Sequence, residues 1–128
     1  MSAYSKINLL DIDDSAKDNE NIEARFARKP LDSRDLGITL LRYKPNFRSP
    51  MAHSHRVQEE AYVVIKGSGK ILLNGKVTDL KVWDVVRVAP ETTRAIEAGP
   101  EGIEVIAIGG PKPAESDGVR QEPNWPSD

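Results

Sequence analysis

The chain has 128 residues, 38% of them hydrophobic and 30% charged, which predicts one globular domain. Lys and Arg total 18 against 20 for Asp and Glu, a formal net charge of −2 without the clustered cations of a nucleic-acid-binding domain. No apolar run is long enough to cross a membrane, and no secretory signal precedes the first elements, so we expect a cytoplasmic protein. Cysteine is absent, which excludes disulfides, a thiolate nucleophile and Cys-ligated zinc.

The first third of the chain predicts an N-terminal extension, residues 1–37, with short strands. Residues 4–10 have the pattern of a strand, and an acidic, polar stretch follows at residues 11–21. This acidic stretch lacks the glycine of an EF-hand loop, so a solvated loop is favoured over a calcium site. Residues 22–28 fit a strand better than a helical turn, and Pro30 ends that element.

Residues 38–109 predict the core of the domain. Short apolar segments recur there at regular spacing with glycine turns between them, and Asn74-Gly75 is a strong hairpin signal. This pattern, without long helical periodicity, is typical of an antiparallel sandwich or barrel. The segments expected to form strands are 38–43, 60–65, 70–73, 77–80, 82–88, 93–98 and 103–108.

The composition changes after Gly110. Four of the chain's prolines lie in residues 110–128, and we expect an irregular tail there. Trp125 is unusual in such a segment, because a tryptophan near a terminus generally docks on its own domain or on a partner subunit.

Both histidines of the chain lie close together, at His53 and His55. On a strand, residues two apart face the same side, so the two imidazoles point the same way. Glu60 opens the next predicted strand and shares a face with Tyr62, whereas Glu59 lies on the opposite face. If these two strands pair, His53, His55 and Glu60 converge as a 2-His-1-carboxylate metal site with open coordination positions.

The segment around these histidines resembles motif one of the cupin superfamily, commonly written G-x5-H-x-H-x3-4-E-x6-G. His53, His55 and Glu60 match its three ligands and Gly67 its last glycine, while Phe47 replaces the first glycine. The resemblance covers about residues 38–108. It implies an all-β, cupin-type double-stranded β-helix (jelly-roll) barrel, with an N-terminal strand extension and an irregular C-terminal tail.

Residues 83–94 align with a looser form of motif two, G-D-V-V-x-V-P-P-G-T-x-H. Trp83 stands where the motif has its first glycine, and Ala89 and Glu91 replace a proline and the second glycine. Arg94 stands where the motif has its histidine ligand. A guanidinium stays protonated and cannot ligate a metal, so the spacing of the motif is kept and its fourth ligand is lost.

Two arrangements of the site follow from this substitution. In the first, His53, His55 and Glu60 hold one divalent ion (the resemblance implies iron, manganese, nickel or zinc) and Arg94 turns toward an anionic ligand. In the second, Arg94 pairs with Glu60, no metal is bound, and the barrel is an empty small-molecule pocket. A third interpretation makes the histidines surface strand residues without a site.

Strand alternation gives the candidate ligand-binding residues. Arg94, Tyr62 and Ile96 are expected to line the pocket, and Tyr43 and Met51 are weaker candidates.

Three classes of function therefore stay open. The first is a metal-dependent enzyme of the dioxygenase, isomerase or decarboxylase type, acting on a small anionic molecule. The second is a non-catalytic, metal-free binding protein in which Arg94 replaces the metal. The third is an interaction module that exchanges its ends between subunits, and the resemblance also implies a homodimer. Fold alone does not choose among them, nor does it decide whether the chain is an enzyme.

Overall fold

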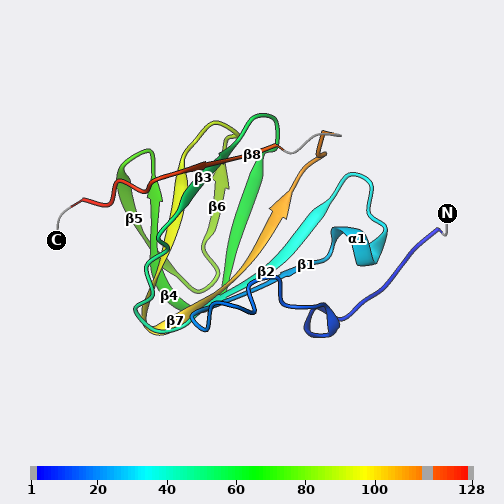
Figure 1. Cartoon of the computed structure of the whole chain (residues 1–128), viewed down its shortest axis with the longest axis horizontal. Helices are drawn as coiled ribbons and strands as arrows, with labels where there is room; N and C mark the ends of the chain where they lie inside the picture. Colours follow the sequence, from blue (N-terminus) through cyan, green and yellow to red (C-terminus); the bar gives the residue numbers. More distant parts are fainter. Residues whose placement is uncertain (1–2, 114–116, 127–128) are drawn as a thin grey trace.

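The computed structural model describes residues 3–113 and 117–126. The regular structure of these residues is mostly antiparallel strand, as the sequence predicts (Figure 1). The predicted segments 60–65 and 70–73 are one continuous strand, and so are 93–98 and 103–108. The elements are η1, a short 3-10 helix (Leu9–Asp11), β1 (Ile22–Phe26), α1 (Arg28–Leu31), β2 (Gly37–Tyr43), β3 (Ala52–His55), β4 (Glu60–Leu73), β5 (Lys76–Lys81), β6 (Val85–Val88), β7 (Arg94–Gly109) and β8 (Gly118–Gln121).

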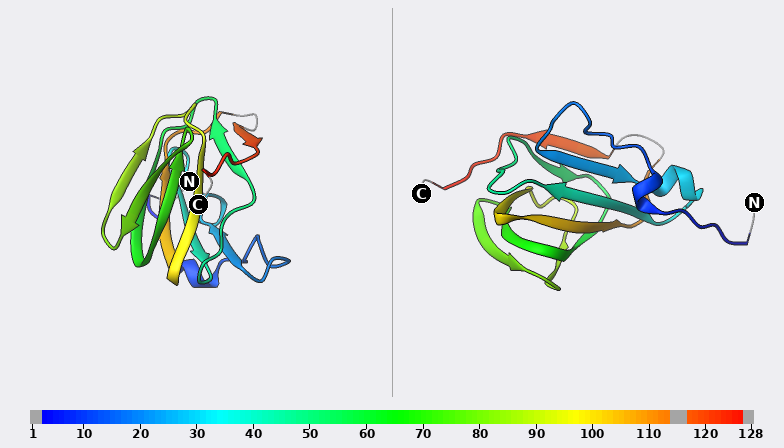
Figure 2. Two further views of the ribbon diagram at one scale, coloured as in Figure 1. Left: turned by 90° about the vertical axis from the view of Figure 1, so that its left-hand side faces the viewer. Right: turned by 90° about the horizontal axis from the view of Figure 1, so that it is seen from below.

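The two longest strands, β4 and β7, pair along most of their length and form the spine of the sheet. At the C-terminal end of β7, β2 pairs with β7 and β1 pairs with β2. At its N-terminal end, β3 pairs with β7 and β8 pairs with β3, while β5 and β6 pair with β4. Two register shifts in the β4–β7 ladder bend both strands, and such bends curl a sheet on itself. Figure 2 shows the result, with β5 and β6 on one side of the interior and β8 on the other. The predicted all-β barrel is confirmed.

Gly67 lies at one of these bends and shows why motif one ends in glycine. Its φ of +76° is in the left-handed region, and a Cβ at this position would overlap the carbonyl oxygen of Gly102 on β7. Only glycine allows the two strands to approach this closely.

The interior is filled by alternate residues of the long strands, as a period of two requires. Tyr62 and Val64 of β4 lie in this core, which also contains Ile71, Leu80, Val88, Ile96, Ala98, Ile103, Val105 and Ala107. A second, smaller cluster of Ala52, Leu72 and Ala95 lies beside it.

The N-terminal extension differs from prediction in its first element. Residues 4–8 are not a strand, and Leu9–Asp11 forms a 3-10 helix because the Asn8 side chain accepts the Leu10 N–H and caps it. The following loop is fastened to β1 by Asp14, whose carboxylate accepts the N–H groups of Ala16 and Ala24, both at 2.9 Å. The strand expected at residues 22–28 is confirmed as β1, which ends at Phe26.

The C-terminal tail is more ordered than its composition predicts. Its expected irregularity is wrong at Gly118–Gln121, which forms β8 on the free edge of β3, a stretch that contains no proline. Trp125 docks on its own domain: Nε1 donates to the Ser49 carbonyl at 3.4 Å, and the Arg48 guanidinium lies 4.7 Å from the ring centroid. The ring also packs against the cluster of Ala52, Leu72 and Ala95.

Candidate metal-binding site

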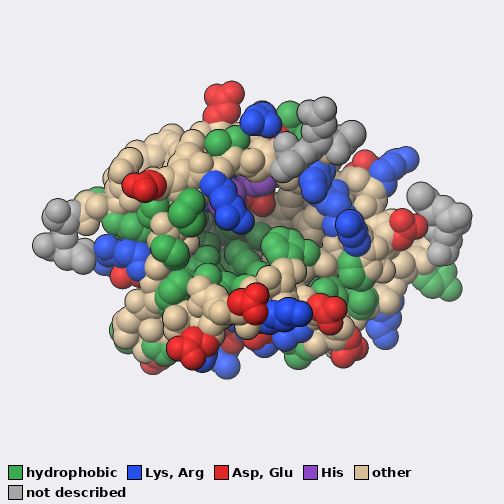
Figure 3. All heavy atoms as spheres, in the orientation of Figure 1, with side chains coloured by type: hydrophobic (Ala, Val, Ile, Leu, Met, Phe, Trp, Pro, Cys, Tyr) green, Lys and Arg blue, Asp and Glu red, His purple; other side chains and the backbone are tan. Residues whose placement is uncertain are grey.

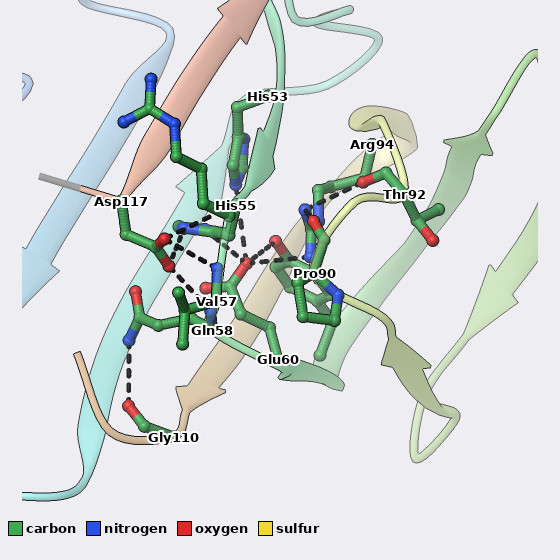
Figure 4. A network of polar contacts seen from close by, with 12 residues as sticks. His53, His55, Val57, Gln58, Glu60, Pro90, Thr92, Arg94, Gly110 and Asp117 are labelled. Atoms are coloured by element: carbon green, nitrogen blue, oxygen red, sulfur yellow. Dashed lines mark hydrogen bonds and ion pairs between the residues drawn. The ribbon is translucent and has the colours of Figure 1, made fainter. Parts of the chain in front are cut away.

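The two histidines reach Glu60 across the interior of the barrel rather than through a shared ladder. Their strands do not pair with each other, since β3 pairs with β7 and β8, while β4 pairs with β5, β6 and β7. The curl of the sheet carries β3 over the start of β4, and Figure 4 shows both imidazoles directed at the Glu60 carboxylate.

The three side chains form a compact group. One ligand atom from each of His53, His55 and Glu60 lies within 4.8 Å of the others. The Nε2 atoms of His55 and His53 are 3.1 and 3.6 Å from Glu60 Oε1. The His53 side chain is 42% exposed, against 13% for His55 and 15% for Glu60, so the group opens toward solvent on the His53 side.

Glu60 is held as an anion. Burial on its own would raise the pKa of this carboxyl, but contacts from His53, His55 and Tyr62 hold its pKa well below the usual range. The Tyr62 hydroxyl donates to Oε1 at 2.8 Å. Burial, and next the charge of Glu60, raise the pKa of Tyr62, so its phenol stays a neutral donor.

Arg94 lies directly opposite His53 in the β3–β7 register and is only 1% exposed. Its Nη1 donates to the carbonyl oxygens of Thr92 and Pro90, at 2.9 and 3.1 Å, and its Nη2 donates to that of Ala89 at 3.4 Å. Nη2 also lies 3.6 Å from Glu60 Oε1. The guanidinium therefore braces the loop before β7 and adds one long ionic contact with Glu60, without the two-pronged pairing that arginine makes with a carboxylate at full contact.

Asp117 belongs to the same network, and sequence reasoning did not find it. It is 2% exposed, and its carboxylate accepts the N–H groups of Arg56, Val57 and Gln58 at 2.7–2.9 Å. Burial would raise its pKa, but these backbone donors lower it. Asp117 Oδ2 lies 3.4 Å from His55 Nδ1, on the side of the ring away from Glu60 (Figure 4). No spacing rule points to Asp117, because it comes from the far end of the chain.

Two cavities adjoin the group. One of about 230 Å³ is lined by His55 and Glu60, and one of about 750 Å³ is lined by His53, with Tyr43 and Met51 in its wall. Phe26 lines both. Figure 3 shows a hollow whose floor carries hydrophobic side chains, with a histidine at its upper edge and both basic and acidic side chains at its rim.

The structure brings some of the predicted ligand-binding residues to the group and leaves one in the core. Arg94 and Tyr62 both contact Glu60, whereas Ile96 is packed in the core cluster with Val64 and Val105. Direct ligand contact by Arg94, Tyr62 and Ile96 stays a prediction.

The curled antiparallel sheet has the fold of a cupin-type β-barrel. The chain is similar to the crystal structure of a cupin protein from Bacteroides fragilis, with a TM-score of 0.73, 21% identity and 91% of both chains covered. It is also similar to a variant of oxalate decarboxylase from Bacillus subtilis, with a TM-score of 0.79, 18% identity, and 94% of this chain and 33% of that chain covered.

Salicylate 1,2-dioxygenase from Pseudoaminobacter salicylatoxidans is a further similar structure, with a TM-score of 0.63, 16% identity, and 71% of this chain and 25% of that chain covered. The chain thus spans about a third of the decarboxylase and about a quarter of the dioxygenase. No protein-family model matches the sequence, and no curated protein matches it. At identities this low, the similarities establish the fold.

Proposed function

We propose that this domain binds a small anionic molecule beside a divalent metal ion held by His53, His55 and Glu60. The observation that carries the proposal is the state of His55. Both of its ring nitrogens are buried and make no hydrogen bond to any described residue, and Nε2 lies 3.1 Å from the anionic Glu60 oxygen. A cation shared between an imidazole nitrogen and a carboxylate oxygen suits this arrangement.

Asp117 supports the same assignment. A proton on His55 Nδ1, the nitrogen nearest Asp117, leaves the lone pair of Nε2 for a metal, and a carboxylate behind a ligating histidine generally has this role. The donor set of two imidazoles and one carboxylate suits iron, manganese, nickel or zinc and leaves positions open for water or ligand. When bound, such an ion would supply Lewis-acid polarisation for isomerase or decarboxylase chemistry, and a redox-active iron or manganese would supply oxygen activation for dioxygenase chemistry.

The metal-free binding protein is the second candidate function, and one observation favours it. The Arg94 guanidinium already lies 3.6 Å from Glu60 Oε1, and Tyr62 donates to the same oxygen. Arg94 thus supplies a positive charge and Tyr62 a hydrogen bond to Glu60 without any metal. In that case the cavity beside His53 is a simple ligand pocket.

The metal content of variants at two neighbouring carboxylates, Glu60 and Glu59, separates the two candidate functions. Glu60→Gln removes a proposed ligand, whereas Glu59→Gln changes an exposed carboxylate that pairs with Arg87 on the outer face. We expect the wild type and Glu59→Gln to retain manganese or zinc after desalting, and Glu60→Gln and His53→Ala to lose it, as measured by mass spectrometry of the metal content. A wild type without affinity for any of the four metals would exclude the metal site and leave the metal-free binding protein.

The cytoplasmic location and the homodimer stay predictions. Among the described residues, no helix has the length and apolar character needed to cross a bilayer.

A further inference from the structure

The strand β8 places a second arginine beside the site. In the β3–β8 ladder, Arg120 is the direct partner of His53, and in the β3–β7 ladder Arg94 is the partner of the same residue. Direct partners on neighbouring antiparallel strands point to the same face. Arg94, His53 and Arg120 therefore form one row across three strands, with His53 in the middle.

The two arginines of this row differ in what they can offer a ligand. Arg94 is buried, and its amino groups are directed at the carbonyl oxygens of the loop before β7 and at Glu60. Arg120 is exposed and lines the cavity of about 750 Å³. Within residues 3–113 and 117–126, no carboxylate forms an ion pair with Arg120, so its guanidinium can bind an anion that enters the cavity.

The remaining wall of this cavity is largely apolar. Phe26, Tyr43, Met51 and Ala52 line it, and His53 marks the side nearest the metal group. A guanidinium at the edge of an apolar wall suits a ligand with a carboxylate at one end and a hydrophobic body at the other.

We propose that Arg120 binds the carboxylate of a small apolar acid whose hydrophobic part lies against Phe26, Tyr43 and Met51. The inference rests on the proposed function, because it places the anionic ligand in the cavity next to His53. It extends that function by naming the class of ligand and a residue that no motif of the sequence indicates. The C-terminal tail thereby becomes part of the binding site.

Benzoate and its uncharged analogue benzamide are suitable probes, with binding measured by calorimetry or by NMR titration. The variants are Arg120→Gln, Arg120→Lys and, as a matched control, Arg87→Gln, which removes an exposed arginine from the outer face. We expect benzoate to bind the wild type and Arg87→Gln alike. Loss of a charge-assisted hydrogen bond should weaken its binding to Arg120→Gln by roughly ten-fold or more. Arg120→Lys should be intermediate, and benzamide should bind weakly to all four proteins.

The inference is overturned if benzoate binds Arg120→Gln as tightly as the wild type, if benzamide binds as tightly as benzoate, or if the wild type binds neither. Metal content of the same samples separates this inference from the metal proposal. If the protein contains no metal and its benzoate affinity still depends on Arg120, the metal proposal fails and the inference about Arg120 stands. If the protein contains metal and its benzoate affinity does not depend on Arg120, the metal proposal stands and the inference fails.

Discussion

The guanidinium of Arg94 lies 3.6 Å from the Glu60 carboxylate, yet its shorter contacts are with the carbonyl oxygens of Thr92 and Pro90. Arg94 is therefore anchored in the loop that precedes β7, and Glu60 is a secondary partner. An arginine at a position where the cupin motif has a histidine thus keeps a positive charge near the group without filling the point between His53, His55 and Glu60.

Arg94→His tests this geometry directly. The imidazole would stand opposite His53 on β7, and we expect affinity for zinc or manganese to rise by about ten-fold or more, the scale on which supporting residues alter metal sites. Competition with a chelator of known affinity measures the change. Arg94→Leu is the control, because it removes the charge without adding a metal ligand. Equal affinities of the two variants would show that residue 94 does not reach the metal.

Asp117→Ala is expected to weaken both the loop and the metal site. The N–H groups of Val57 and Gln58 lose their acceptor, while that of Arg56 keeps the carbonyl oxygen of residue 117, so we expect the free energy of unfolding to fall by about 1–3 kcal/mol. Loss of the carboxylate behind His55 should lower metal affinity by roughly 10–100-fold.

Asp117→Asn separates these two effects. The amide oxygen still accepts the N–H groups of Arg56 and Val57, while the NH2 group meets the N–H of Gln58 and cannot accept it. The charge near His55 is gone, so stability should recover in part while metal affinity stays low. Urea unfolding and metal titration of both variants give the two numbers. Full metal affinity in Asp117→Asn would contradict a role for the charge.

The local part of the site could be predicted from the sequence. His53 and His55 share a face because strand alternation is fixed within a few residues, and the same rule put Glu60 inside and Glu59 outside. The partners of β3 could not be predicted, because pairing depends on which edges remain free after the whole sheet has curled. Asp117 and Arg120 reach the site only through the pairing of β8 with β3, and they were missed for that reason.

In the second motif, Trp83 has a backbone conformation that its side chain does not favour. Trp83 stands where the motif has glycine, and its φ is +75°, a conformation that glycine adopts without cost. Its N–H donates to the Val64 carbonyl at 2.8 Å, which holds the turn against β4. Trp83 thus has a backbone conformation suited to the glycine that it replaces in the motif, and the sequence alone did not show that strain.

Asp14 should make the stability of the protein depend on pH. The N–H groups of Ala24 and Ala16 lower its pKa from the ordinary 3.8. The stabilisation is therefore fully present above that value and is lost as the pH falls through the lower pKa of the folded state. We expect the difference in unfolding free energy between wild type and Asp14→Asn to be constant near neutral pH and to shrink at acidic pH, as measured by urea unfolding. A difference that does not change with pH would contradict this role.

Trp125 should contribute to stability without controlling assembly. It packs on its own domain, so we expect Trp125→Ala to lower the free energy of unfolding by about 1–3 kcal/mol, less than for a fully buried tryptophan.

Light scattering of the protein shortened after residue 122 tests whether the tail holds two subunits together. We expect its oligomeric state to equal that of the full chain, and a change of state would support exchange of the tail.

Trp83→Gly should lower the free energy of unfolding less than the loss of a tryptophan usually does. The side chain is 72% exposed, so its removal creates no cavity, and glycine relieves the positive φ. Trp83→Ala is the matched control, because alanine removes the same side chain but keeps the strained backbone. Since a left-handed conformation costs a non-glycine residue roughly 1–2 kcal/mol, we expect the glycine variant to be more stable than the alanine variant by about 1 kcal/mol in urea unfolding. An alanine variant of equal or greater stability would show that the turn relaxes without strain, and that the glycine of the motif has no conformational role at this position.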